Sequence, residues 1–276
     1  MADTGWLQII GAALGGGFVG GITLKILDIG YQEFQRRRTE RVTAGKFVDE
    51  HLDPLLKSAD ELNGKLRSLA ESDFLELHDV DYTKLSESHQ FASLLFLFGS
   101  FWAQIEIIHQ QGMTVAMGRD IRGARLQQFF DCLESRRVRI VDRILQRAVG
   151  EVFIKDGKSI SFVDFVSAFD ADGDTRKWLS ALAIFLSRMR HTTERQKLLQ
   201  YGAVVHALID TLDPAHFVTR ERPSWPNKLT RRSWQDLNYR VFGRYLNFVE
   251  NKRKYLGPPK RAARQRGRQP GKTLEP

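Results

Sequence analysis

The sequence predicts an all-α protein, in which an N-terminal single transmembrane helix is followed by a multi-helix cytosolic bundle with at most one small β-hairpin. Two observations lead to this prediction. Residues 6–24 read WLQIIGAALGGGFVGGITL, without a formal charge, and apolar residues recur at helical spacing in most of the chain beyond them. A third observation, Asp156-Gly157 between two short β-prone runs, accounts for the expected hairpin.

The uncharged run has the length of a membrane span. Its 19 residues would form a helix of about 28 Å, close to the roughly 30 Å thickness of a bilayer's hydrocarbon core. Asp3 precedes the run, whereas Lys25, Arg36, Arg37, Arg38 and Arg41 follow it. Because basic residues collect on the cytoplasmic side of a span, we expect a short extracytoplasmic stub at 1–5, a transmembrane helix at 6–27, and the remaining chain in the cytoplasm.

Three other interpretations each fit part of this run. A cleaved signal peptide requires a positively charged start, which MADTGW lacks. Gly15, Gly17 and Gly20 fit the G-x-G-x-x-G fingerprint of dinucleotide binding, but no alternation of strands and helices follows them. A buried helix of a soluble protein is the third alternative, because glycines lower both hydrophobicity and helix propensity.

Several glycines of the run are spaced four residues apart and so share one helix face. In a bilayer, such small residues let two helices approach closely, which favours a homodimer. The expected packing residues are Gly11, Gly15, Gly16, Gly17, Gly20 and Gly21.

Four regions are expected after the stub: the transmembrane helix at 6–27, a basic juxtamembrane helix at 28–53, a cytosolic helical domain at 54–250 and a disordered basic tail at 251–276. Asp53 and Pro54 resemble an N-cap and the first residue of a helix. The net charge of +9 is concentrated in the tail, which has nine basic residues against Glu275. A single cysteine, Cys132, rules out an intramolecular disulfide framework.

Apolar stripes predict the helices of the domain. Residues 91–108 are the most apolar stretch and are expected to be a central core helix, with a second membrane segment as the alternative. Further helices are expected at 55–69, at 126–145 as one long helix, from about 174 to 189, at 193–212 and at 234–249.

Candidate metal and catalytic residues are few. Glu106 and His109 form one E-x-x-H pair, but a di-iron bundle requires two such pairs and two further glutamates. Asp170, Asp172 and Asp174 lack the glycine and glutamate of a calcium-binding loop. No phosphate loop, nucleophile motif or zinc motif is complete, so we expect no cofactor and no metal. An enzyme with an unrecognised site stays an alternative.

Basic side chains are the remaining candidates for binding. The arginines of the predicted 126–145 helix are expected to form a solvent-exposed face, on which they pair with Asp131, Glu134 and Asp142. A loop at 220–234 interleaves basic residues with Trp225 and Trp234, which suits nucleic acid or a membrane interface. The residues expected to meet anionic lipid or nucleic acid are Arg36, Arg37, Arg38, Lys252, Arg253, Lys254, Lys260, Arg261, Arg264, Arg266 and Arg268.

Three segments carry a resemblance to known sequences: LLFLFGSFWAQIEII at Leu94 to Ile108, QRAVGE at Gln146 to Glu151 and HALIDTLDP at His206 to Pro214. Through them the chain resembles, from Asp53 to Pro214, an uncharacterised family of helical bacterial proteins. The resemblance implies a bacterial source and an all-helical body, and it carries no functional residue.

Taken together, these features predict a membrane-anchored helical interaction or scaffold protein of the bacterial inner membrane, with a single span and an unidentified protein partner. The first alternative is a membrane-proximal nucleic-acid-binding protein that uses the basic tail and the 220–234 loop. The basic residues face the bilayer in the first interpretation and gather away from it in the second.

Overall fold

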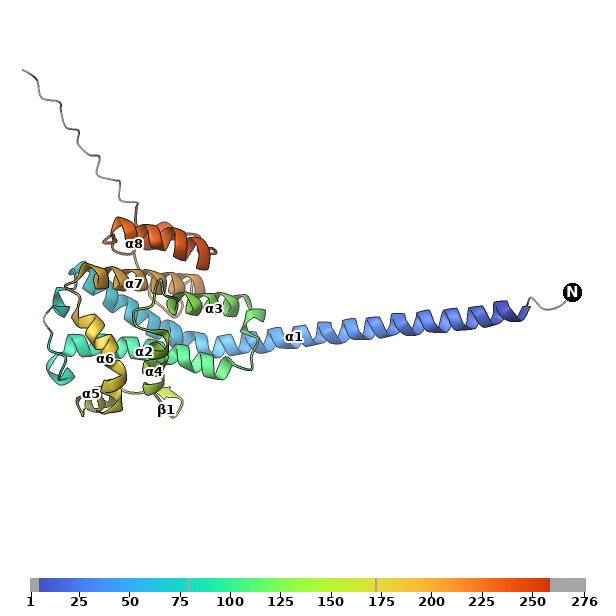
Figure 1. Cartoon of the computed structure of the whole chain (residues 1–276), viewed down its shortest axis with the longest axis horizontal. Coiled ribbons are helices and arrows are strands. Elements are labelled where there is room, and N and C mark those ends of the chain that lie inside the picture. Colours follow the sequence, from blue (N-terminus) through green and yellow to red (C-terminus); the bar gives the residue numbers. More distant parts are fainter. Residues whose placement is uncertain (1–4, 79, 172, 259–276) are drawn as a thin grey trace, which may run out of the picture.

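The computed structural model describes the backbone of residues 5–78, 80–171 and 173–258, and the side chains from residue 31 onward within these ranges. Its helices pack into one body, from which the first helix extends as a long arm (Figure 1). This helix, α1 (Gly5–Glu71), is continuous over 67 residues. Its side chains become buried from Ala44 and Val48 onward, so the C-terminal part of α1 belongs to the core of the body.

The core of the body is built on α1 and two apolar helices, α2 (His89–Gly112) and α7 (Thr192–Leu212). Phe98, Trp102 and Tyr201 meet between α2 and α7, where the indole N–H of Trp102 donates a hydrogen bond of 2.8 Å to the Tyr201 hydroxyl. Burying these large side chains stabilises the pairing of the two helices by several kcal/mol, at about 25 cal/mol per Å² of apolar surface.

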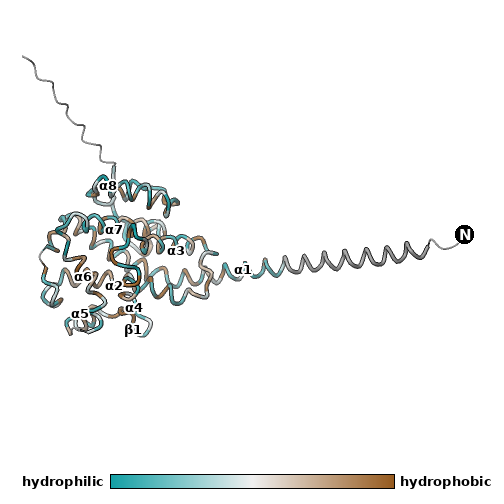
Figure 2. The backbone as a smooth tube through the Cα atoms, in the orientation of Figure 1, coloured by the Kyte–Doolittle hydropathy of each residue, from teal (hydrophilic) through white to brown (hydrophobic). Residues whose placement is uncertain are grey.

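Shorter elements surround this core, and side-chain caps begin several of them, as with Asp120, Asp142 and Ser161. Figure 2 shows apolar and polar positions alternating along the helices of the body, as expected for amphipathic helices. The elements are α3 (Ile121–Leu133), α4 (Arg143–Val152), α5 (Phe162–Asp170), α6 (Asp174–Ser187), α8 (Arg231–Gln235), the π-helix η4 (Asp236–Tyr245), α9 (Lys252–Leu256), and the 3₁₀ turns Leu75–Leu77, Leu85–Glu87 and Met117–Arg119.

The predicted hairpin is present. Strands β1 (Ile154–Lys155) and β2 (Lys158–Ser159) pair antiparallel, and Ile154 lies opposite Ser159. Asp156 and Gly157 both have positive φ, as a two-residue turn of type I′ requires. The prediction of a mostly helical fold with one small hairpin is therefore confirmed.

Residues 91–108 lie in α2. Among the residues whose side chains are described, α2 is the one helix with the length and apolar composition of a membrane span, and 72% of its most apolar stretch is buried in the body. This burial favours the core-helix interpretation over a second membrane segment.

The expected helix start at Asp53 and Pro54 is wrong. Pro54 lies inside α1, and no break separates a juxtamembrane helix from the domain at that point. A proline in a helix interior costs about 3 kcal/mol, because it removes one backbone hydrogen bond and crowds the preceding turn. Leu52, Leu55 and Leu56 are buried around it, and their burial offsets this cost.

Two further helix predictions need correction. The single helix expected at 126–145 is divided: α3 ends at Leu133 and α4 begins at Arg143. Val138 and Ile140, which continue the apolar pattern, are buried from the connecting loop. Helix α5 was not predicted, although Ser161 caps it and accepts a hydrogen bond from the Asp164 amide, a recognisable start signal.

The basic tail was expected to be disordered from residue 251, and this is wrong for its first residues. Residues 252–256 form α9, and Tyr255 and Leu256 are buried in the body. The tail from residue 259 onward lies outside the described residues.

Candidate functional site: a basic cleft

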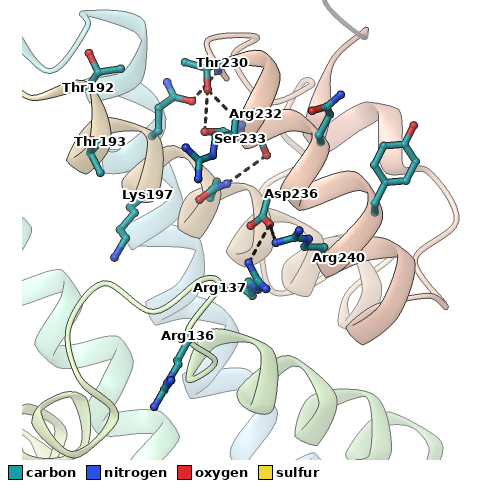
Figure 3. A pocket seen from close by; sticks show the side chains of 14 residues that line it. Arg136, Arg137, Thr192, Thr193, Lys197, Thr230, Arg232, Ser233, Asp236 and Arg240 are labelled. Carbon is teal, nitrogen blue, oxygen red and sulfur yellow. Dashed lines mark hydrogen bonds and ion pairs between the residues drawn. The ribbon is translucent and has the colours of Figure 1, made fainter.

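A polar cleft of about 710 Å³ opens between the start of α7, the loop after α3, and the segment formed by α8 and η4. Figure 3 shows side chains from these three segments around it. Among the described residues that line the cleft, five are basic and one is acidic, Asp236. The basic residues are Arg136, Arg137, Lys197, Arg232 and Arg240.

Hydrogen bonds from two glutamines fix the start of α8 to α7. The Gln196 side chain donates to the Lys228 carbonyl at 3.0 Å and accepts from the Thr230 amide at 2.7 Å. Gln200, which is buried, donates to the Ser233 carbonyl at 3.2 Å. Because these bonds join segments more than 30 residues apart, they hold two walls of the cleft in a fixed relation.

The single carboxylate of the lining is shared by two arginines. One Asp236 oxygen lies 3.5 Å from an Arg137 nitrogen and 3.4 Å from an Arg240 nitrogen. Arg136, Lys197 and Arg232 are exposed and form no ion pair with any described residue. The lining therefore has an excess of four positive charges, and three of its cations are available to a ligand.

The first turn of α7 lies at the same cleft. Its N-cap residue, His191, makes no capping hydrogen bond through its side chain. Thr192 and Thr193, which follow it, line the cleft. The first N–H groups of a helix have no intrahelical partner, and together with the helix dipole they attract anions. The cleft therefore has the chemistry of an anion site, with phosphate groups as suitable ligands.

The cleft lies near the end of the body that is farthest from the N-terminal arm. Lys228, whose carbonyl is bonded to Gln196, also places its ammonium group 2.8 Å from Asp73 and 3.2 Å from the Glu71 carbonyl, at the C-terminal end of α1. In Figure 1, α7 begins at the end of the body opposite to the arm. Residues 24 and 71 of α1 are separated by about 70 Å of helix, at about 1.5 Å per residue.

The cleft does not use the residues that the sequence suggested for anion binding. Arg36 and Arg37 lie on the exposed part of α1, paired with Glu40 at 2.9 Å and Glu33 at 2.7 Å, and Arg38, which follows them, is exposed. On α9, Lys254 is fixed 2.7 Å from Asp210, and neither Lys252 nor Arg253 lines the cleft. Lys260, Arg261, Arg264, Arg266 and Arg268 lie outside the described residues.

The surface of interleaved basic residues and tryptophans expected at 220–234 is present only in part. Arg222 is held by Asp60 at 2.7 Å, Lys228 by Asp73, and Trp225 is buried. These contacts fasten the loop onto α1 and occupy two of its five basic side chains, whereas Arg220, Arg231 and Arg232 are exposed. Arg232 is the residue of this predicted surface that reaches the cleft.

Most of the arginines at 125–147 are paired, as expected. Glu134 forms ion pairs with Arg143 at 2.5 Å and with Arg147 at 3.7 Å, and Arg139 forms one with Asp142 at 3.0 Å. Arg136 and Arg137 line the cleft; Arg137 is paired there with Asp236, and Arg136 has no ion pair among the described residues. Sequence reasoning did not single out Lys197 or Arg240, and no local signal distinguishes them from solvated basic residues of a helix surface.

The E-x-x-H pair forms part of a structural network. His109 Nδ1 lies 3.7 Å from Glu106, 3.9 Å from Glu134 and 3.2 Å from an Arg147 nitrogen. Burial lowers the pKa of His109, which the two carboxylates only partly oppose. Within the described ranges, no group of three or more His, Cys, Asp or Glu residues is arranged to hold a metal ion.

A second buried polar cluster surrounds Asp210 of α7. Its Oδ2 accepts from the Tyr255 hydroxyl at 2.9 Å, lies 2.7 Å from Lys254 Nζ and 3.6 Å from His206 Nε2. The His206 ring is buried beside Tyr255 and Trp225, and neither ring nitrogen has a hydrogen-bond partner among the described residues. Burial lowers the pKa of His206 to about 4, so this imidazole is neutral at pH 7.

The six glycines proposed for helix packing lie in the part of α1 whose backbone alone is described. Comparisons of the chain with protein-family models, with curated proteins and with solved structures found no match. The resemblance over Asp53 to Pro214 therefore stays a prediction, and any assignment of function rests on the geometry of the site.

Proposed function

We propose that this protein is a membrane-anchored helical interaction module that binds a phosphate-bearing ligand in the basic cleft. One observation carries the proposal: five cations and the uncapped start of α7 converge on a cleft with a single carboxylate. Three of these cations have no ion-pair partner among the described residues, and such cations are free to neutralise phosphate.

The anchor is residues 6–24, for the reasons of length and flanking charge given above. The course of α1 supports this assignment, because the arm extends away from the body instead of folding onto it (Figure 1). We place the N-terminus outside a bacterial inner membrane and the body in the cytoplasm. A dimer through the glycine face is part of the same proposal.

The position of the cleft favours a ligand in solution over lipid headgroups of the anchoring bilayer. About 70 Å of helix separates the end of the apolar run from the level of the cleft. The attraction between a charge and an anionic membrane surface decays within about a Debye length, roughly 8 Å at physiological salt. With α1 along the membrane normal, the cleft is therefore too far from the anchoring bilayer to bind its headgroups.

The test is binding of inorganic polyphosphate to the full-length protein in phosphatidylcholine nanodiscs, measured by titration calorimetry at several salt concentrations. The cleft variant is Lys197→Glu with Arg232→Glu. The control variant, Lys46→Glu with Lys158→Glu, makes the same change in net charge at two exposed residues outside the cleft.

We expect the cleft variant to weaken binding at least tenfold and to lower the slope of log K against log salt by about 2, one for each lost phosphate contact. The control variant should change the affinity less than threefold. Equal losses in the two variants would show a general charge effect and reject the cleft. Displacement of polyphosphate by added phosphatidylserine vesicles would favour lipid headgroups instead.

A further inference from the structure

The cleft combines its basic residues with one exposed aromatic ring. Tyr239 of η4 lines the cleft and is 67% exposed. Trp234 packs against this ring edge to face, with centroids 6.3 Å apart and an interplanar angle of 84°. This contact holds the tyrosine in place while most of its surface stays open to solvent. An anion site for phosphate alone has no need of such a ring.

The backbone under this ring is unusual. Asp236, Tyr239 and Arg240 all lie on η4, a π-helix of 10 residues. π-Helical turns are rare and occur frequently at functional sites. This one places a carboxylate, an aromatic ring and a guanidinium on the wall that faces Thr192 and Lys197 of α7.

The described chain ends next to this wall. The Gly257 carbonyl accepts a hydrogen bond of 3.3 Å from the Trp234 indole, so the chain leaves the described fold close to Trp234 and Tyr239. Residues 259–276 contain six basic residues and one acidic residue, and 18 residues span at most about 60 Å. Six further cations in this length of chain suit a polymeric anion, whereas a mononucleotide would not need them.

We propose that the ligand of the basic cleft is single-stranded nucleic acid, with its phosphates on Arg136, Lys197 and Arg232 and one base stacked on Tyr239. Cations beside an aromatic ring are the usual means of binding single strands, because every base can stack. A duplex fits less well, since its grooves receive a protruding helix or ribbon and this site is concave. This assignment rests on the proposed function of the cleft.

The experiment compares a labelled 20-nucleotide oligo-dT with inorganic polyphosphate of similar charge. The oligonucleotide is measured by fluorescence anisotropy and the polyphosphate as its competitor, on the full-length protein in phosphatidylcholine nanodiscs. The variants are Tyr239→Ala, Tyr239→Phe, which keeps the ring, and Arg232→Glu, with Lys158→Glu as the control. Tyr239 is exposed, so its truncation leaves the core intact.

We expect Tyr239→Ala to lower the preference for oligonucleotide over polyphosphate by roughly 5- to 100-fold, as the loss of one stacked base predicts. Tyr239→Phe should restore most of this preference, and Arg232→Glu should weaken both ligands. If Arg232→Glu weakens both while Tyr239→Ala leaves the preference unchanged, single-stranded nucleic acid is rejected and the phosphate-binding function survives. If Arg232→Glu affects neither ligand, both proposals fail. A hairpin duplex that binds more tightly than oligo-dT would also overturn the assignment.

Discussion

His206 should make the folded body sensitive to mild acid. Its ring is buried in the cluster around Asp210, and its pKa is lowered to about 4. Burial is the main cause, Lys254, Arg67 and Arg222 add to it, and Asp210 partly opposes it. In the unfolded chain the pKa of histidine is about 6.5. As pH falls below 6.5, the unfolded state therefore binds a proton that the folded state still excludes, and stability decreases.

The expected magnitude follows from the two pKa values. Between pH 7 and pH 5, a shift from 6.5 to about 4 reduces the free energy of unfolding by about 2 kcal/mol, and the loss is complete below the folded pKa. His206→Phe removes the titrating group and keeps a flat ring beside Trp225 and Tyr255. The free energy of unfolding of this variant should fall by about 2 kcal/mol less than that of the natural protein over the same pH range.

Guanidinium unfolding of the full-length protein in nonionic detergent, followed by tryptophan fluorescence at pH 7 and pH 5, measures this difference. Other groups that titrate in this range, such as His109, are present in both proteins, so their contributions cancel. Equal losses of stability in the two proteins would refute the reasoning. So would an NMR titration that gave His206 a pKa near 6.5.

Two further substitutions test the packing around the 213–230 loop. Gly202→Ala should destabilise the body by about 1–3 kcal/mol and lower its thermal midpoint, because the new methyl group would overlap the buried Trp225 indole. The control is Gly118→Ala, whose methyl group meets no neighbouring atom within 4 Å and should change the thermal midpoint little. The buried Asp213 carboxylate accepts hydrogen bonds from the backbone amides of residues 217–219 at 2.9–3.0 Å. Asp213→Ala should therefore lower the free energy of unfolding by about 2–4 kcal/mol and speed hydrogen exchange at these three amides. Unchanged exchange at these amides would contradict the role given to Asp213.

The helices that form the core could be predicted from the sequence, because each of them has a stripe of buried apolar residues at helical spacing. The predicted helix at 193–212 differs from α7 by one residue at its start, and Asp213-Pro214 ends it as expected. Pro54 misled the prediction because local propensity favours a helix start there, whereas burial of the neighbouring leucines keeps α1 continuous.

The cleft could not be predicted, since tertiary packing assembles it from three distant segments. The sequence does not distinguish a basic residue that is free to bind a ligand from one that forms an ion pair within the protein. Arg222 is neutralised by Asp60, 162 residues away, while Arg232, ten residues further along, is free to bind a ligand. The π-helical turn that brings Tyr239 into the site has no recognised sequence pattern either.

If residues 6–24 form the proposed anchor, the continuity of α1 ties the direction in which the cleft faces to the number of residues between this anchor and the body. An α-helix turns about 100° and advances about 1.5 Å with each residue. Where residues 6–24 are fixed in a bilayer, deleting one residue between 28 and 43 would rotate the whole body by about 100° around α1, whereas deleting seven would return it to within about 20° and bring it about 10 Å closer to the membrane. Under the proposed anchoring, the length of this segment, counted in helical turns, therefore sets the azimuth of the cleft relative to any neighbour in the same membrane.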